Sequence, residues 1–188
     1  MKKVSSIIIL IALCLSFVSC GKDMSNDVSN NVTNDVSNNY SLNFVMFVEE
    51  LNQLVGPDAM FLSMERTSTR QSYDNNYTSI YTLTSMYQNE YKVAIIYEGN
   101  SIKSIDIYGE RAEISEGRYL LNIDYHTLVA KTYQILTEQT DAYGLLIDKF
   151  DINSQDAEIT KIESTENWTM IYSANNERIS FLFQLVTT

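Results

Sequence analysis

The sequence predicts an α+β domain in which two helices pack on antiparallel meander sheet or sheets. Three observations lead to this fold class. Apolar residues recur at helical spacing in two separate stretches, the stretches that follow each of them alternate with a period of two, and the connections between the alternating stretches are short. A mostly β sandwich or barrel with helices at its edges is the alternative architecture.

The first helix is expected between residues 44 and 55. Its apolar stripe consists of Phe44, Phe47, Val48, Leu51 and Val55. Ser41 is the expected N-cap, and Gly56 followed by Pro57 is a typical stop signal.

The first group of strands follows this helix directly. Period-two alternation predicts strands near residues 60–65, 81–87, 91–97 and 102–108. Residues 88–90 and 98–100 have the composition of hairpin turns. Because these connections are short, we expect neighbouring strands to pair antiparallel.

The second half of the chain repeats this order. Residues 109–117 are charged and are expected to form a solvated connection. A second helix, capped by Asp124, is expected to end before Gly144. Its stripe is Tyr125, Leu128, Val129, Tyr133 and Leu136, and strands are expected at residues 158–164, 168–173 and 178–186.

The two halves, residues 40–109 and 118–188, suggest the hypothesis of a tandem duplication. Residues 91–108 and 168–185 each contain an aromatic-led strand, a turn with Asn, and an apolar strand. Matching them requires a gap of one residue. Because any two hairpins of a β-rich protein share this pattern, the duplication stays a hypothesis.

The N-terminus has the features of an export signal over residues 1–19. Lys2 and Lys3 precede an apolar stretch that is shorter than the roughly 20 residues needed to span a bilayer. The sequence Phe17-Val18-Ser19-Cys20 resembles the lipobox of bacterial lipoproteins. The resemblance implies that Cys20 is lipidated, becomes the first mature residue and attaches the protein to a membrane.

The same resemblance implies a location in the cell envelope, outside the cytoplasm. In a cell with two membranes the outer membrane is favoured, because Gly21 replaces the Asp that the lipoprotein class uses for inner-membrane retention. A cleaved, lipid-free secreted form is the alternative. The only cysteines are Cys14 and Cys20, so residues 40–188 can form no disulfide of their own.

Residues 20–39 are expected to form a disordered tether after the lipidated cysteine. The hexamer Asn-Asp-Val-Ser-Asn-Asn occurs at residues 26–31 and again at 34–39. Isolated valines in such a polar tract bury too little apolar surface to offset the loss of chain entropy. Residues 40–188 are therefore expected to form one globular domain.

The charge balance excludes nucleic acid as a partner. The chain has 13 basic and 24 acidic residues, a net charge of −11. Removing residues 1–19 takes away Lys2 and Lys3 and no acid, so the mature charge is 11 − 24 = −13. Because the basic residues are scattered between acids, the sequence contains no basic cluster that could bind a phosphate backbone or an anionic lipid surface.

The search for catalytic or metal-ligating residues yields no candidate, and no cofactor is implied. His126 is the only histidine, and its place off the predicted apolar stripe suggests an exposed side chain. The acid pairs Glu49–Glu50 and Glu163–Glu166 are the nearest candidates for carboxylate chemistry, but chance explains such pairs in a chain with 24 acids.

Thirteen tyrosines are the most unusual feature of the composition. Tyr81, Tyr87, Tyr91 and Tyr97 share the strand alternation and are expected to face the helices as core. Tyr108 and Tyr119 are better candidates for exposure, and no ligand-binding residue can be named.

The sequence thus predicts a lipid-anchored envelope lipoprotein with a non-catalytic domain that binds an unknown protein or small molecule. An exported carboxylate-dependent hydrolase and a purely structural envelope protein are the alternatives.

Overall fold

The computed structural model describes residues 42–186 except 112, 116–117 and 120–121. The predicted signal, Cys20, the tether and the expected N-cap Ser41 lie outside the described residues. The elements are α1 (Phe44–Asn52), β1 (Phe61–Gln71), β2 (Asn76–Ser85), β3 (Glu90–Glu98), β4 (Ser101–Glu110), β5 (Glu113–Ser115), β6 (Arg118–Tyr119), α2 (Ile123–Thr137), α3 (Ala142–Phe150), β7 (Ile159–Ser164), β8 (Trp168–Ala174) and β9 (Arg178–Leu185).

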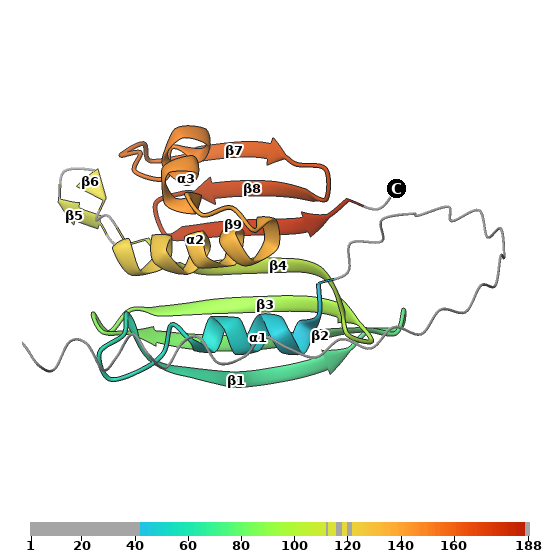
Figure 1. Cartoon of the computed structure of the whole chain (residues 1–188). Coiled ribbons are helices and arrows are strands. Elements are labelled where there is room, and N and C mark those ends of the chain that lie inside the picture. Colours follow the sequence, from blue (N-terminus) through green and yellow to red (C-terminus); the bar gives the residue numbers. More distant parts are fainter. Residues whose placement is uncertain (1–41, 112, 116–117, 120–121, 187–188) are drawn as a thin grey trace, which may run out of the picture. The chain divides into compact units, whose positions relative to one another are not determined.

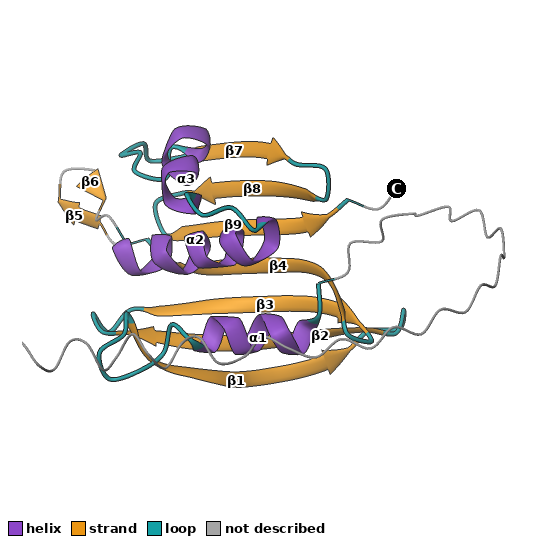
Figure 2. Ribbon diagram, viewed as in Figure 1, coloured by secondary structure: helices purple, strands orange, loops and turns teal. Residues whose placement is uncertain are grey.

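Seven strands form one antiparallel sheet in the order β1-β2-β3-β4-β9-β8-β7, while β5 and β6 form a separate small hairpin. The helices α1, α2 and α3 all lie on one face of the large sheet (Figure 1). Figure 2 shows the same arrangement as one layer of helices against one layer of strands. Helices on an antiparallel sheet of meanders are therefore confirmed, but the expectation of two helices is wrong because the described chain has three.

Helix α1 is capped by Asn43, so the prediction of Ser41 as its N-cap is wrong. The Asn43 side-chain oxygen accepts hydrogen bonds from the backbone N–H groups of Val45 at 2.9 Å and Met46 at 3.3 Å, which leaves two fewer unpaired donors at the helix start. Phe47 and Leu51 from the predicted stripe are fully buried. The helix ends at Asn52, three residues before the expected end.

Helix α3 is the element that the sequence did not reveal. Asp141 precedes it, and the Asp141 side chain accepts a hydrogen bond from the backbone N–H of Gly144 at 3.2 Å. A Cβ atom on Gly144 would lie 2.8 Å from Asp141 Oδ1. Gly144, which suggested the end of a helix, therefore lies in the first turn of α3. A side chain at this position would collide with the capping carboxylate of Asp141.

Helix α2 also begins differently from the prediction. Asn122, not Asp124, is the residue that precedes it, and Asp124 is buried in its first turn. The helix ends at Thr137, and Glu138, the residue that follows, has a left-handed conformation with a φ of 58°. The predicted apolar stripe is buried as expected.

The strands bury alternate residues, so the core lies between the sheet and the helices. Tyr81 and Tyr91 are buried there, as predicted, and Tyr97 is half-buried with its ring stacked on that of Phe44 at 4.0 Å. The prediction for Tyr87 is wrong. This residue belongs to the turn after β2, not to the strand, and 58% of it is exposed.

The centre of the sheet is the pairing of β4 with β9, the last strands of the two halves. Ile105 pairs with Phe183, Ile107 pairs with Phe181, and Asp106 pairs with Leu182 between them. The register shift in the β3–β4 pairing leaves Lys103 without a directly opposite residue. This β-bulge is one extra residue in the first hairpin, and it explains the gap of one residue that is needed to match residues 91–108 to residues 168–185.

Candidate functional site

The sheet face without helices presents alternate residues of all seven strands, and we call it the uncovered face. Strand pairing arranges it in rows, and three of these rows run from β1 to β7. Arg178 lies beyond them, where it pairs with Glu110 of β4. The three rows are Ser68-Ile80-Ala94-Asp106-Leu182-Ile171-Ile162, Glu65-Thr82-Lys92-Tyr108-Ser180-Ser173-Thr160 and Arg70-Thr78-Ile96-Ser104-Gln184-Thr169-Ser164.

The three rows together carry no net charge, although the whole chain carries −11. They contain two acids, Glu65 and Asp106, and two bases, Arg70 and Lys92. Ser and Thr hydroxyls and aliphatic side chains supply most of the remaining positions. A low density of charged side chains is a feature of surfaces that a partner covers.

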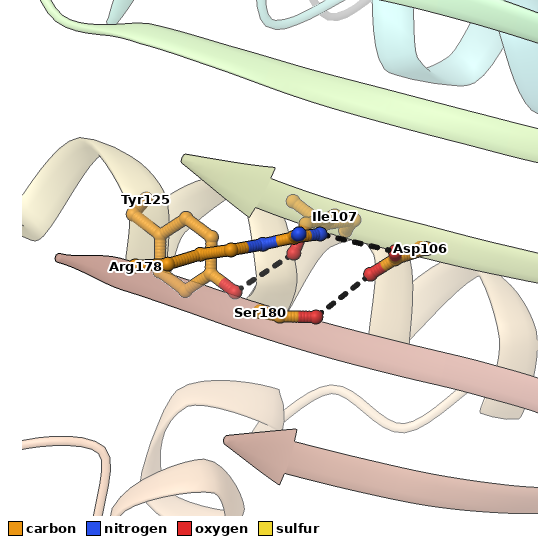
Figure 3. Close-up of polar contacts among 5 residues, drawn as sticks. All are labelled: Asp106, Ile107, Tyr125, Arg178 and Ser180. Carbon is orange, nitrogen blue, oxygen red and sulfur yellow. Dashed lines mark hydrogen bonds and ion pairs between the residues drawn. The ribbon is translucent and has the colours of Figure 1, made fainter. Parts of the chain in front are cut away.

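A cluster of four residues, the Arg178 cluster, lies on this face where β4 pairs with β9. Ser180 Oγ donates a hydrogen bond to Asp106 Oδ1 at 2.8 Å, and Arg178 Nη2 lies 3.6 Å from Asp106 Oδ2 (Figure 3). The Arg178 guanidinium carbon lies 4.3 Å from the centre of the Tyr108 ring. The carboxylate and the ring together restrict where the guanidinium can lie.

The opposite face of the same strand pair is fixed by helix α2. Figure 3 shows the Tyr125 hydroxyl, which donates to the carbonyl oxygen of Ile107 at 2.9 Å. Burial, which is complete for Tyr125, raises the pKa of this phenol well above its usual value, so the hydroxyl remains a donor. The backbone beneath Asp106 is thus held from the helix side.

A hollow of about 450 Å³ lies beside the Arg178 cluster, at the turn between β8 and β9. Its lining consists of Glu158, Ile159, Thr160, Ser173, Ala174, Asn175, Arg178 and Ser180. Arg178 and Ser180 belong to both the cluster and the hollow. The volume falls within the range of about 300–1,000 Å³ that is usual for small-molecule sites.

Arg111 connects two chain segments next to this hollow. Its guanidinium donates to the carbonyl oxygens of Ser154 at 3.2 Å, Ala157 at 3.1 Å and Asn175 at 3.3 Å. These contacts join the segment before β7 to the turn between β8 and β9. Residues 109–117 were expected to be solvated, but β4 continues to Glu110 and Arg111 is buried, so that prediction is wrong for this arginine.

A second polar cluster is buried on the helix side of the sheet. Asp124 Oδ1 accepts hydrogen bonds from the Tyr91 hydroxyl at 2.8 Å and the Tyr125 backbone N–H at 3.0 Å, and its Oδ2 accepts one from Asn89 at 2.9 Å. Burial alone would raise the pKa of Asp124, but the donors around it, with Ser85 among them, hold the pKa below its usual value. Asp124 therefore ties α2 to β3.

His126 is buried, which contradicts the expectation of an exposed histidine. It is 4% exposed, and its ring lies 6.0 Å from that of Tyr125 and 6.4 Å from that of Tyr143 in α3. Burial lowers its pKa to about 4, against an opposing effect of the Asp124 charge. The prediction failed because it did not include α3, which covers this side of α2.

The carboxylate pairs considered from the sequence are not brought together as a site. Glu50 forms an ion pair with Lys131 of α2 at 3.1 Å, while Glu163 lies on β7 and the exposed Glu166 lies in the turn that follows. Across residues 42–186, outside the stated gaps, no three His, Cys, Asp or Glu side chains are grouped as a metal site. Nor does this part of the chain contain a helix long and apolar enough to cross a membrane.

Of the two tyrosines expected to be exposed, Tyr108 is half-buried beneath Arg178, and the side chain of Tyr119 lies outside the description. The Arg178 cluster was not found from the sequence. Asp106 and Arg178 are 72 positions apart, and only the pairing of β4 with β9 makes them neighbours.

Comparisons with protein-family models, with curated proteins and with solved structures gave no match to this chain.

Proposed function

We propose that the chain is a lipid-anchored extracytoplasmic protein whose domain binds a partner or ligand through the uncovered face, without catalysing a reaction. The balanced charge of the three rows across this face is the observation that carries the proposal. In a chain with a net charge of −11, three rows of balanced charge across seven strands repel an acidic partner less than the rest of the surface does. The exposed side chains of Ile96 and Ile162 add apolar area to this face.

The hollow beside Arg178 supports a binding role over that of a structural spacer. A spacer needs no concave surface, whereas a binding domain uses one to bury its ligand. The Arg178 cluster next to the hollow holds its side chains in fixed positions through Asp106 and Tyr108. Groups that are already ordered lose less conformational freedom when a ligand binds.

We propose that lipid on Cys20 attaches the protein to the membrane, because residues 17–20 resemble a lipobox. Each buried acyl methylene contributes about 0.8 kcal/mol, and two or more chains make a stable anchor. Incorporation of labelled palmitate is expected in the wild type and not in a Cys20→Ser variant. Unlabelled wild-type protein would contradict the anchor and leave the binding role unaffected.

The binding role is tested by affinity capture from envelope extracts with residues 40–188. Leu182→Arg places a new charge at the centre of the uncovered face, opposite Asp106. Met46→Arg is the matched control, because Met46 is 63% exposed on α1 and its side chain is outside the uncovered face. We expect one partner to be captured by the wild type and by Met46→Arg and to be lost with Leu182→Arg.

Capture of the same partner by all three proteins would contradict binding through the uncovered face. Capture of no specific partner by the wild type would remove the support for a protein partner. Both variants must show the unfolding transition of the wild type, so that loss of capture reports the surface and not the fold.

We also infer that the two halves of the sheet are copies of one unit. The register supports this inference. If Ile105 corresponds to Phe181 and Ile107 to Phe183, exchanging the two halves exchanges the pairs Ile105–Phe183 and Ile107–Phe181 and leaves the pairing of β4 with β9 unchanged. The bulge at Lys103 accounts for the single gap. An experimental structure in which the β3–β4 and β8–β9 backbones superpose only in another register would contradict the duplication.

A further inference from the structure

We propose that the hollow beside Arg178 is a subsite for a neutral, polyhydroxylated ligand, namely a sugar unit of a glycan. This inference rests on the proposed binding function and names the chemical class of the ligand. The hollow contains donors and acceptors whose directions are set by contacts within the protein.

The hydrogen bond to Asp106 determines whether Ser180 acts as a donor or an acceptor toward a ligand. Because the Ser180 hydroxyl donates its proton to Asp106 Oδ1 at 2.8 Å, its oxygen can only accept a further hydrogen bond. Arg178 has five N–H donors and no acceptor, and the contact to Asp106 at 3.6 Å involves one of its nitrogens. An acceptor and several donors thus lie side by side.

A sugar hydroxyl fits such a pair, because it donates one hydrogen bond and accepts others. Two neighbouring hydroxyls on a ring can donate to Ser180 Oγ and accept from the Arg178 guanidinium. A fully deprotonated anion has no proton to donate to Ser180, and an apolar ligand would leave both groups without a partner. The pair therefore favours a diol over either alternative.

The row of hydroxyls along the floor extends this pattern. Ser180 is paired with Ser173, and Ser173 is paired with Thr160 on the next strand. Neighbouring strands are about 4.8 Å apart, a spacing close to the width of one pyranose ring. All three hydroxyl side chains line the hollow.

The charges around the hollow disfavour an anionic ligand. Glu158 is exposed in the lining, and Asp106 already balances the charge of Arg178. The net charge of −11 adds a repulsive field around the whole chain. A neutral glycan meets no such repulsion, and the Glu158 carboxylate can accept from its hydroxyls.

The walls of the hollow are fixed before a ligand arrives. Arg111 joins the carbonyl oxygen of Asn175, which lines the hollow, to that of Ala157, which precedes the lining residue Glu158. The Asn175 side-chain oxygen accepts from the backbone N–H groups of Glu177 and Arg178 at 2.9 and 2.8 Å, which shapes the turn that carries Arg178. Binding therefore costs little ordering of the protein.

The test is calorimetric titration of the full-length protein in a detergent without a sugar headgroup. The probes are maltotriose, cellotriose, chitotriose and, as the anionic comparison, trigalacturonic acid. Arg178→Ala removes the donors, Ser180→Ala removes the acceptor, and Thr82→Ala is the matched control, since Thr82 lies in the same row of the uncovered face but outside the hollow.

We expect saturable binding of at least one neutral trisaccharide. Loss of a hydrogen bond to a charged group predicts that Arg178→Ala weakens binding about tenfold or more, and loss of a neutral one predicts about threefold to tenfold for Ser180→Ala. Thr82→Ala is expected to bind like the wild type. Each variant is first required to keep the wild-type unfolding transition.

Binding of trigalacturonic acid alone would overturn the proposal in favour of an anion site. Binding of a neutral sugar that is unchanged in Arg178→Ala and Ser180→Ala would overturn the placement of the ligand, and binding of no probe would overturn the ligand class. If no probe binds while Leu182→Arg still abolishes capture of a protein partner, the sugar subsite fails and the proposed binding function stands.

Discussion

The single histidine makes the stability of this protein depend on pH in a window that can be calculated. In the unfolded chain the pKa of His126 is about 6.5, and in the folded chain burial lowers the pKa to about 4. Between these values the unfolded chain binds a proton that the folded chain does not. The free energy of unfolding therefore falls as the pH falls through this window.

The size of the effect follows from the two pKa values. Lowering the pH from about 7.5 to about 4.5 is expected to remove about 2.5 kcal/mol of unfolding free energy through His126 alone. Asp124 adds no loss in this window. Its pKa is below the usual value, and its contribution is lost only when the pH falls further, through its folded pKa.

Urea unfolding at several pH values measures this difference. A His126→Phe variant is the control, because it keeps an aromatic ring in the buried position and removes the titrating group. The difference in unfolding free energy between wild type and variant is expected to change by about 2.5 kcal/mol across the window. Parallel pH dependences for the two proteins would refute the burial of His126.

Three further substitutions test contacts that hold the fold. Tyr91→Phe removes a donor from the buried Asp124 carboxylate, so urea unfolding should show a loss of about 1.5–3 kcal/mol, and a loss below about 0.5 kcal/mol would contradict this contact. Gly109→Ala places a Cβ atom 2.4 Å from the Tyr91 ring, so the same measurement should show a loss of about 1–3 kcal/mol, and wild-type stability would mean that the ring moves freely. Asn43→Ala removes the cap of α1, so thermal unfolding should reveal a loss of about 1 kcal/mol, while Asn43→Asp should retain the cap.

The regular part of the fold was predictable because its signals are local. The stripe of α1 and the alternation of β3 depend on neighbours within a few positions, and both put the expected residues in the core. Strand β1 runs from Phe61 to Gln71, well beyond the expected stretch of 60–65. As an edge strand, it carries charged and polar side chains that interrupt the alternation.

The errors came from contacts between distant segments. Gly144 suggested a helix end because its packing against the Asp141 cap is not visible in the sequence. The burial of His126 depends on α3, and that of Arg111 depends on carbonyl groups more than 40 positions away. In each case the residue was misassigned because its partners were unknown.

The candidate site could not be predicted for the same reason. Asp106 and Ser180 belong to the two strands that close the sheet at its centre, and each is an ordinary polar residue of an alternating strand. Arg178 follows an Asn-rich turn and has no local signal of its own. Only the order of strands in the sheet shows that they lie on the same uncovered face.

Side-chain footprinting with hydroxyl radicals, in intact envelopes and on the purified protein, tests the central claim most directly. Ile96, Tyr108 and Ile162 report the uncovered face, and Met46 and Tyr73 are exposed positions outside its rows. We expect the first three to be oxidised less in the envelope than in the purified protein, with the other two unchanged. Equal oxidation of the uncovered face in both samples would contradict the account.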